Sequence, residues 1–115
     1  MRTGAARAWA LGAALVLAAA AASLLAPSQP GYDAWAWLLW GREVAHLDLD
    51  TVDGPAFKPL PVAVTTVLSA FGGAAPELWL VLARAGAIAA VLLGARLAWR
   101  LAGGSAAAAA VAGLG

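Results

Sequence analysis

The chain has 115 residues, of which 63% are hydrophobic and 11% are charged, with a net charge of +1 and no cysteine. Soluble domains usually carry about 25% charged residues, so the composition argues against a water-soluble globule, and the length allows one domain at most. The small net charge gives no indication of nucleic-acid binding, and the lack of cysteine excludes disulfides and thiolate metal sites.

The first element in chain order is an uncharged apolar run from about residue 8 to residue 26. As a helix it would be roughly 28 Å long, close to the ~30 Å hydrocarbon core of a bilayer. Arg2 and Arg7 precede it, and Pro27 and Pro30 follow it. A cleaved signal peptide has a similar basic start and small residues, but the apolar remainder of the chain favours a retained span.

The next candidate helix covers residues 33–49. Its apolar side chains recur at helical spacing, which is typical of an interfacial helix with tryptophan anchors; they are Trp37, Trp40, Val44 and Leu47. An acidic turn over residues 48–55 follows. Its three aspartates loosely resemble a calcium loop but lack the remaining ligands, so a solvated turn is expected.

A second short helix is expected over residues 60–71. It would be about 18 Å long, too short to cross a bilayer. Pro59 and Pro61 suit its first turn, Gly72 and Gly73 end it, and a proline at position 76 opens the next helix. We therefore expect two juxtamembrane helices within one loop, from about residue 27 to residue 76.

A second full span is predicted over about residues 77–101, with Arg84 as the only charge before Arg96. Small residues repeat every fourth position within it, at Gly86, Ala90 and Gly94. Such a face lets helices approach closely, although a general alanine and glycine bias explains it equally well. Residues 105–115 then make about 16 Å of apolar helix, which predicts the start of a third span and a chain that is the N-terminal part of a larger protein.

The distribution of charge predicts an orientation. Arginines lie before the first span, at Arg2 and Arg7, and at the end of the second span, at Arg96 and Arg100. Every acidic residue lies between residues 33 and 77. The positive-inside rule then places both ends of the hairpin in the cytoplasm and the loop outside. The predicted fold class is an all-α polytopic protein of the plasma or inner membrane, with two full spans, a truncated third and two juxtamembrane helices.

The ordered motifs resemble those at the N-terminus of GT-C fold membrane glycosyltransferases, such as the protein O-mannosyltransferases and the lipid A aminoarabinose transferases. The segments that carry the resemblance are Tyr32–Trp37, Lys58–Pro61, Phe71–Gly72 and Arg84. It covers roughly residues 7–104. The resemblance implies transfer of a sugar from a polyprenyl-phosphate donor to an acceptor at the outer membrane face, with the 115-residue chain inactive by itself.

The resemblance also implies roles for three residues. Asp33 resembles the general base that takes the acceptor's proton, Lys58 resembles the lysine beside the donor phosphate, and Arg84 resembles a supporting residue. The chain departs from the family at Ala34 and Phe57, where many relatives carry acidic residues, and at Ala36, where some carry a basic one. A divalent metal therefore lacks ligands to support it, and no cofactor is predicted.

Each of these residues also has a structural explanation. Asp33 suits the start of a helix as a cap or through the helix dipole, and Lys58 suits a membrane interface. Arg84 suits snorkelling or a pair with Glu77. His46 has no second histidine or cysteine nearby and is expected to be solvated.

Two other functions remain open on the sequence. One is a small non-enzymatic helical hairpin that binds partner helices through Gly86, Ala90 and Gly94. The other is a signal peptide followed by a single-span anchor. The sequence indicates neither the sugar, the acceptor nor the carrier lipid.

Overall fold

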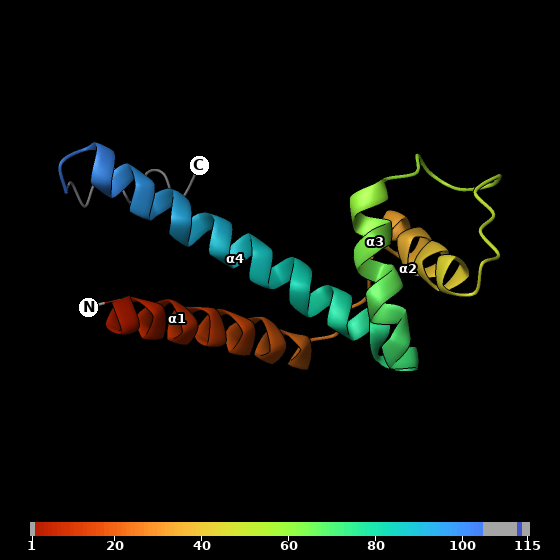
Figure 1. The fold of residues 1–115 in the computed structure, drawn as a ribbon, viewed down its shortest axis with the longest axis horizontal. Coiled ribbons are helices and arrows are strands. Elements are labelled where there is room, and N and C mark those ends of the chain that lie inside the picture. The colour runs from red at the N-terminus through yellow and green to blue at the C-terminus, as the bar shows by residue number, and fades with distance from the viewer. Residues whose placement is uncertain (1, 105–112, 114–115) are drawn as a thin grey trace. The chain divides into compact units, whose positions relative to one another are not determined.

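The computed structural model describes residues 2–104 and residue 113, and the secondary structure of these residues is helical, with no strand among them. The elements are α1 (Arg2–Ala22), η1 (Ser23–Leu25), α2 (Tyr32–Ala45), α3 (Pro59–Leu68), η2 (Ser69–Ala74) and α4 (Ala75–Leu101) (Figure 1). The predicted all-helical class is confirmed for this part of the chain. The predicted start of a third span lies outside the described residues.

Two apolar stretches meet the length and composition of a membrane span, Thr3–Leu25 and Pro59–Leu101. Only 6% of the residues in each apolar window are buried, unlike a core helix of a soluble protein. Both features indicate membrane association, although a signal sequence near an N-terminus meets the same criteria. The second stretch is broken at Gly72, whose φ of 60° and ψ of −126° are not helical, so only α4 within it is long enough to cross.

The first span begins earlier than the predicted residue 8, since α1 extends back to Arg2. At its other end α1 tightens into the 3₁₀ turn η1, and the helix stops before Pro27. At 21 residues α1 is about 31 Å long. The 27 residues of α4 make a helix of about 40 Å, enough to cross with tilt.

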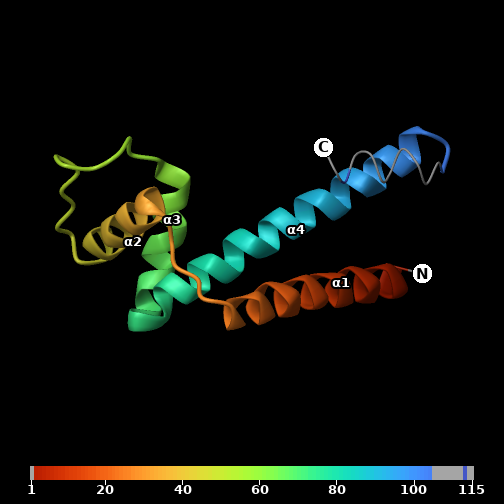
Figure 2. The ribbon, with the colours of Figure 1, turned by 180° about the vertical axis from the view of Figure 1, so that it is seen from behind.

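The chain divides into two units, Met1–Ser23 with Leu82–Gly115, and Leu24–Val81. In the second unit α2 packs against α3, which lies beside it in opposite views (Figures 1 and 2). Gly41 makes this contact close, because a Cβ there would collide with the backbone of Thr65 and Thr66. The apolar residues buried in this unit are Leu38, Trp40, Val62 and Ala75.

Helix α2 is shorter than the predicted helix over residues 33–49. It ends at Ala45 with His46 as its C-cap, and Leu47 adopts a left-handed φ of 57°. Leu47 therefore lies beyond the end of α2, and its predicted place on the apolar stripe of that helix was wrong. The backbone turns there, with the Asp48 N–H donating to the Glu43 carbonyl at 2.9 Å, and this stops the helical periodicity on which the prediction rested.

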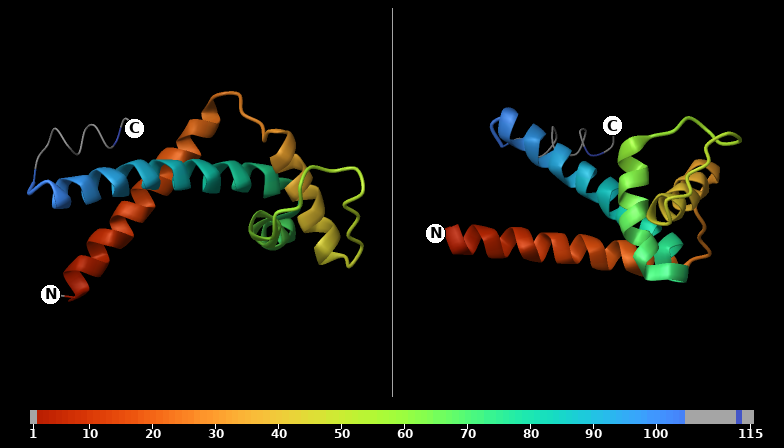
Figure 3. Two further views of the ribbon diagram at one scale, coloured as in Figure 1. Left: turned by 90° about the horizontal axis from the view of Figure 1, so that it is seen from above. Right: turned by 45° about the vertical axis from the view of Figure 1, so that its right-hand side comes forward.

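The long loop between α2 and α3 (Figure 3) is held against α2 by Trp40. The Trp40 indole donates to the Asp50 carbonyl at 2.9 Å, and its ring centroid lies 5.6 Å from that of Phe57. The Asp50 N–H donates to Glu43 Oε2 at 3.1 Å, and Asp50 Oδ1 accepts from the Val52 N–H at 2.9 Å. Asp50 therefore holds the turn through its backbone N–H and its carboxylate, and all three aspartates are exposed.

Candidate functional site

Asp33 lies in the first turn of α2, directly after the connection from η1. Gly31 is the N-cap of this helix and no side chain caps it, so Asp33 does not cap it. Its side chain is exposed and makes no hydrogen bond or ion pair with a residue that the structure describes. A carboxylate in the first turn is stabilised by the helix dipole, and both carboxylate oxygens are left accessible.

Lys58 lies at the N-cap of α3 with extended backbone angles, φ −121° and ψ 109°. Its ammonium lies 5.7 Å from the centroid of the Trp37 ring, a cation–π distance. Trp37 packs edge-on against Trp79 at a centroid separation of 5.7 Å. The ammonium is therefore positioned by an aromatic pair, and the side chain stays exposed.

Trp37 lies on the helix that carries Asp33, and it also contacts Lys58. It follows Asp33 by four residues on α2, and residues at that spacing share one face of a helix. Trp37 therefore lies on the same side of α2 as Asp33, and it contacts the Lys58 ammonium. Asp33 and Lys58 are not joined by an ion pair.

Arg84 belongs to the other unit. Its Nη1 donates to Ser23 Oγ at 2.7 Å, and Ser23 Oγ donates in turn to the Ala20 carbonyl at 2.5 Å. The serine hydroxyl has one hydrogen, so its lone pairs are the ones that accept from Arg84. This contact gives Arg84 a structural partner that the sequence analysis did not name.

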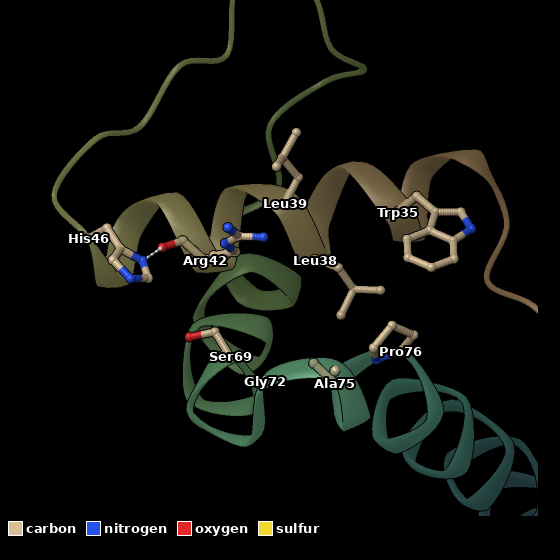
Figure 4. Close-up of a pocket in the computed structure, with 10 residues that line it drawn as sticks. Trp35, Leu38, Leu39, Arg42, His46, Ser69, Gly72, Ala75 and Pro76 are labelled. Atoms are coloured by element: carbon tan, nitrogen blue, oxygen red, sulfur yellow. Dashed lines mark hydrogen bonds between the residues drawn. The ribbon is translucent and has the colours of Figure 1, made fainter.

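A cavity of about 500 Å³ lies elsewhere in the second unit. Figure 4 shows its walls, which come from α2, η2 and the start of α4. The residues that line it are Trp35, Leu38, Leu39, Arg42, His46, Ser69, Gly72, Gly73, Ala75 and Pro76. Neither Asp33 nor Lys58 lines it.

His46 is a lining residue of this cavity and its Nδ1 lies 2.7 Å from the Arg42 carbonyl oxygen. A carbonyl oxygen only accepts, so Nδ1 donates, and Nε2 remains an acceptor in the neutral ring. No group of three or more histidine, cysteine, aspartate or glutamate side chains could hold a metal ion within residues 2–104.

Arg42 and Ser69 were not predicted from the sequence to have a role. The spacing of Arg42 and His46, four residues apart, indicates that they share a helix face. That signal does not find Ser69 and Pro76, which lie about thirty residues further along the chain and reach the cavity only through the packing of α3 on α2.

Comparison with protein-family models, with curated proteins and with solved structures gave no match for this chain.

Proposed function

We propose that this chain is the N-terminal part of a membrane glycosyltransferase that transfers a sugar from a polyprenyl-phosphate donor at the outer membrane face. The observation that supports the proposal is an exposed Asp33 carboxylate in the first turn of α2 together with an exposed Lys58 ammonium that lies 5.7 Å from the ring centroid of Trp37, four residues after Asp33. An exposed carboxylate and an exposed ammonium are the two groups that this transfer needs.

In the proposed reaction Asp33 accepts the proton of the acceptor nucleophile as that nucleophile bonds to the anomeric carbon. The bond between the anomeric carbon and the phosphate oxygen breaks, and the electron pair leaves with the carrier phosphate. Lys58 stabilises the charge that develops on that phosphate, because a fixed ammonium interacts more strongly with the departing anion than with the bound donor. Both groups lie in the segment that joins the two long apolar helices in sequence, so the proposal expects a donor with a membrane-embedded tail to reach them.

The proposed location follows from the same arrangement. All six acidic residues lie between the two long helices or at the start of α4, whereas Arg7, Arg96 and Arg100 lie toward their far ends. The positive-inside rule then favours a multi-pass protein of the plasma or inner membrane with a cytoplasmic N-terminus.

Asp33→Asn in the complete protein tests the proposed base. The variant is reconstituted in liposomes with a panel of polyprenyl-phosphate-linked sugars, and release of free polyprenyl phosphate is measured by mass spectrometry. We expect transfer to slow by about 10²- to 10⁴-fold, the usual contribution of a general base. Asp48→Asn is the matched control, because Asp48 is also an exposed aspartate beside α2, and it should retain activity.

Transfer by Asp33→Asn within twofold of the unaltered protein, at equal expression, would exclude Asp33 as the base. Equal losses in Asp33→Asn and Asp48→Asn would instead attribute the effect to the charge of the loop as a whole.

A further inference from the structure

The cavity between α2, η2 and the start of α4 has two chemically different ends (Figure 4). Arg42, His46 and Ser69 lie toward one end, and Trp35 and Pro76 lie toward the other. A cavity divided in this way matches a ligand with a polar head and an apolar body.

Arg42 supplies the positive charge of the polar end. Its guanidinium makes no hydrogen bond or ion pair with a described residue, although six carboxylates lie in the same unit. Glu43, the nearest in sequence, accepts instead from the Asp50 N–H. An arginine left without a carboxylate in an acidic unit, at the wall of a cavity, suits bidentate binding of a phosphate group.

His46 and Ser69 supply acceptors rather than donors. The Nδ1–H of His46 is used by the Arg42 carbonyl, and the Ser69 hydroxyl donates to the Thr66 carbonyl at 2.6 Å. The atoms left for a ligand are therefore His46 Nε2, which accepts a hydrogen bond in the neutral ring, and the serine oxygen, which also accepts. This combination of one cation and two acceptors selects a phosphate ester that also carries hydroxyl groups.

The opposite end is open and apolar. Trp35 is 46% exposed there, and its ring and Pro76 offer an apolar surface for the glycerol and first acyl carbons of a lipid. The apolar helices α1 and α4 adjoin this segment in sequence and meet the criteria for membrane spans. A membrane lipid is therefore the amphiphilic ligand that this segment would meet.

We propose that this cavity binds an anionic phospholipid whose phosphodiester head carries hydroxyl groups. The phosphate contacts Arg42, the head-group hydroxyls donate to His46 and Ser69, and the apolar part lies against Trp35 and Pro76. This binding goes beyond sugar transfer and does not depend on Asp33 or Lys58.

The test uses the only histidine of the sequence as its reporter. The full chain, labelled with ¹⁵N-histidine, is purified in a neutral maltoside detergent, and the His46 ring signals are followed during titration with dihexanoyl phosphatidylglycerol. We expect a saturable shift. Dihexanoyl phosphatidylcholine, which has the same tails but a zwitterionic head without hydroxyls, should cause none.

Two variants change the site in different ways. Arg42→Gln removes the cation and should weaken binding by roughly ten- to a hundredfold, the range for a charge-assisted hydrogen bond. Gly73→Leu adds a bulky side chain to the lining, at a position where no atom lies within 4 Å of the new Cβ, and should weaken binding about as much. Arg100→Gln removes an arginine that does not line the cavity and should bind as the unaltered chain does.

Equal shifts with phosphatidylcholine, no shift with phosphatidylglycerol, or unchanged binding by folded Arg42→Gln would each overturn the proposal. Glycerol 3-phosphate separates the lipid from a free phosphate ester, because it has the head but no tails. Affinity for glycerol 3-phosphate equal to that for the lipid would overturn the lipid assignment, whereas at least tenfold weaker binding supports it. The lipid comparisons use the unaltered chain, so they decide the proposal even if a variant does not fold.

Discussion

Lys58 is the only lysine in the sequence, and two contacts determine its position. Its backbone forms the N-cap of α3, and its ammonium lies over Trp37. The helix that follows contributes few free donors, because Pro59 and Pro61 have no N–H. An anion at this helix terminus would therefore depend on the lysine ammonium more than on the backbone.

Lys58→Gln in the complete protein should raise the KM for the polyprenyl-phosphate donor by about tenfold or more, the effect of losing one charge-assisted contact. Lys58→Arg keeps the charge and the contact with the Trp37 ring and should stay within a few-fold of the unaltered protein. Initial rates at varied donor concentration measure both. An unchanged donor KM in Lys58→Gln would remove this residue from the phosphate site.

Thr65 is the residue on which the contact between α2 and α3 depends most directly. It is fully buried, and its hydroxyl lies 2.6 Å from the Trp37 carbonyl and 3.0 Å from the Val62 carbonyl. Hydrophobic patterning alone indicates a buried position here and does not identify a hydroxyl between helices. A buried hydroxyl that donates to the neighbouring helix also aligns the two helices along their axes.

Replacing Thr65 by valine keeps the volume and removes the hydroxyl. We expect the variant to lose about 0.5–1.5 kcal/mol of stability, the usual net value of one hydrogen bond. Thr65→Ser keeps the donor and serves as the partner variant. The midpoint of thermal unfolding, followed by tryptophan fluorescence in detergent, measures the loss, and equal midpoints for valine and threonine would show that the hydrogen bond contributes nothing.

At the scale of elements, the helix pair α2–α3 is built on the absence of a side chain at Gly41. A methyl group there would overlap the backbone of Thr65 and Thr66, and backbone cannot move aside as a flexible side chain can. Gly54 has the same role toward the Trp40 ring in the loop. Close approach at these two glycines lets the loop and α3 cover α2.

Gly41→Ala should separate α2 from α3 and destabilise the chain by about 1–3 kcal/mol, the range for overpacking of a filled interior. Gly12→Ala is the control, because nothing lies within 4 Å of an added Cβ there and alanine favours a helix interior by about 0.5–1 kcal/mol. Unfolding midpoints in detergent should therefore move in opposite directions. A Gly41→Ala midpoint that does not fall would contradict the close packing.

The ends of α2 and α3 show how well local sequence patterns predict helix boundaries. Prolines before residue 62 and glycines at 72 and 73 predicted a short helix, and α3 begins at Pro59 and ends at Leu68 before the break at Gly72. The end of α2 was predicted less well. Apolar spacing continued to Leu47, but acidic turn residues close behind it gave the backbone other hydrogen-bond partners.

At the scale of the molecule, acidic residues and most arginines lie in different parts of the chain relative to the two long helices. The acidic residues lie between α1 and α4 or in the first turn of α4. Arg96 lies toward the far end of α4, and its guanidinium lies 4.5 Å from the centroid of the Trp9 ring. Arginine and tryptophan together are typical of a membrane interface. The orientation that this implies is open to direct measurement.

The chain has no cysteine, so single cysteines report the side of the membrane. We expect Thr51→Cys, in the exposed loop, to react with a membrane-impermeant maleimide in intact cells. Ala102→Cys, after α4, should react only once the cells are permeabilised. Labelling of position 102 but not 51 in intact cells would reverse the orientation and place the proposed sugar-transfer site on the wrong face.

The sequence by itself determined the all-helical class, the two apolar helices long enough to cross a bilayer, and the short helix opened by Pro59. These properties depend on residues close together in the chain, whose periodicity and breakers act locally. Only the tertiary structure decided that Lys58 meets Trp37, that Arg84 meets Ser23, and that Ser69 and Pro76 share a cavity with Arg42. Those contacts join residues about twenty to sixty positions apart, so they depend on how the helices pack, and the close approach of α2 and α3 at Gly41 and Thr65 is one that no local pattern distinguishes from ordinary helix residues.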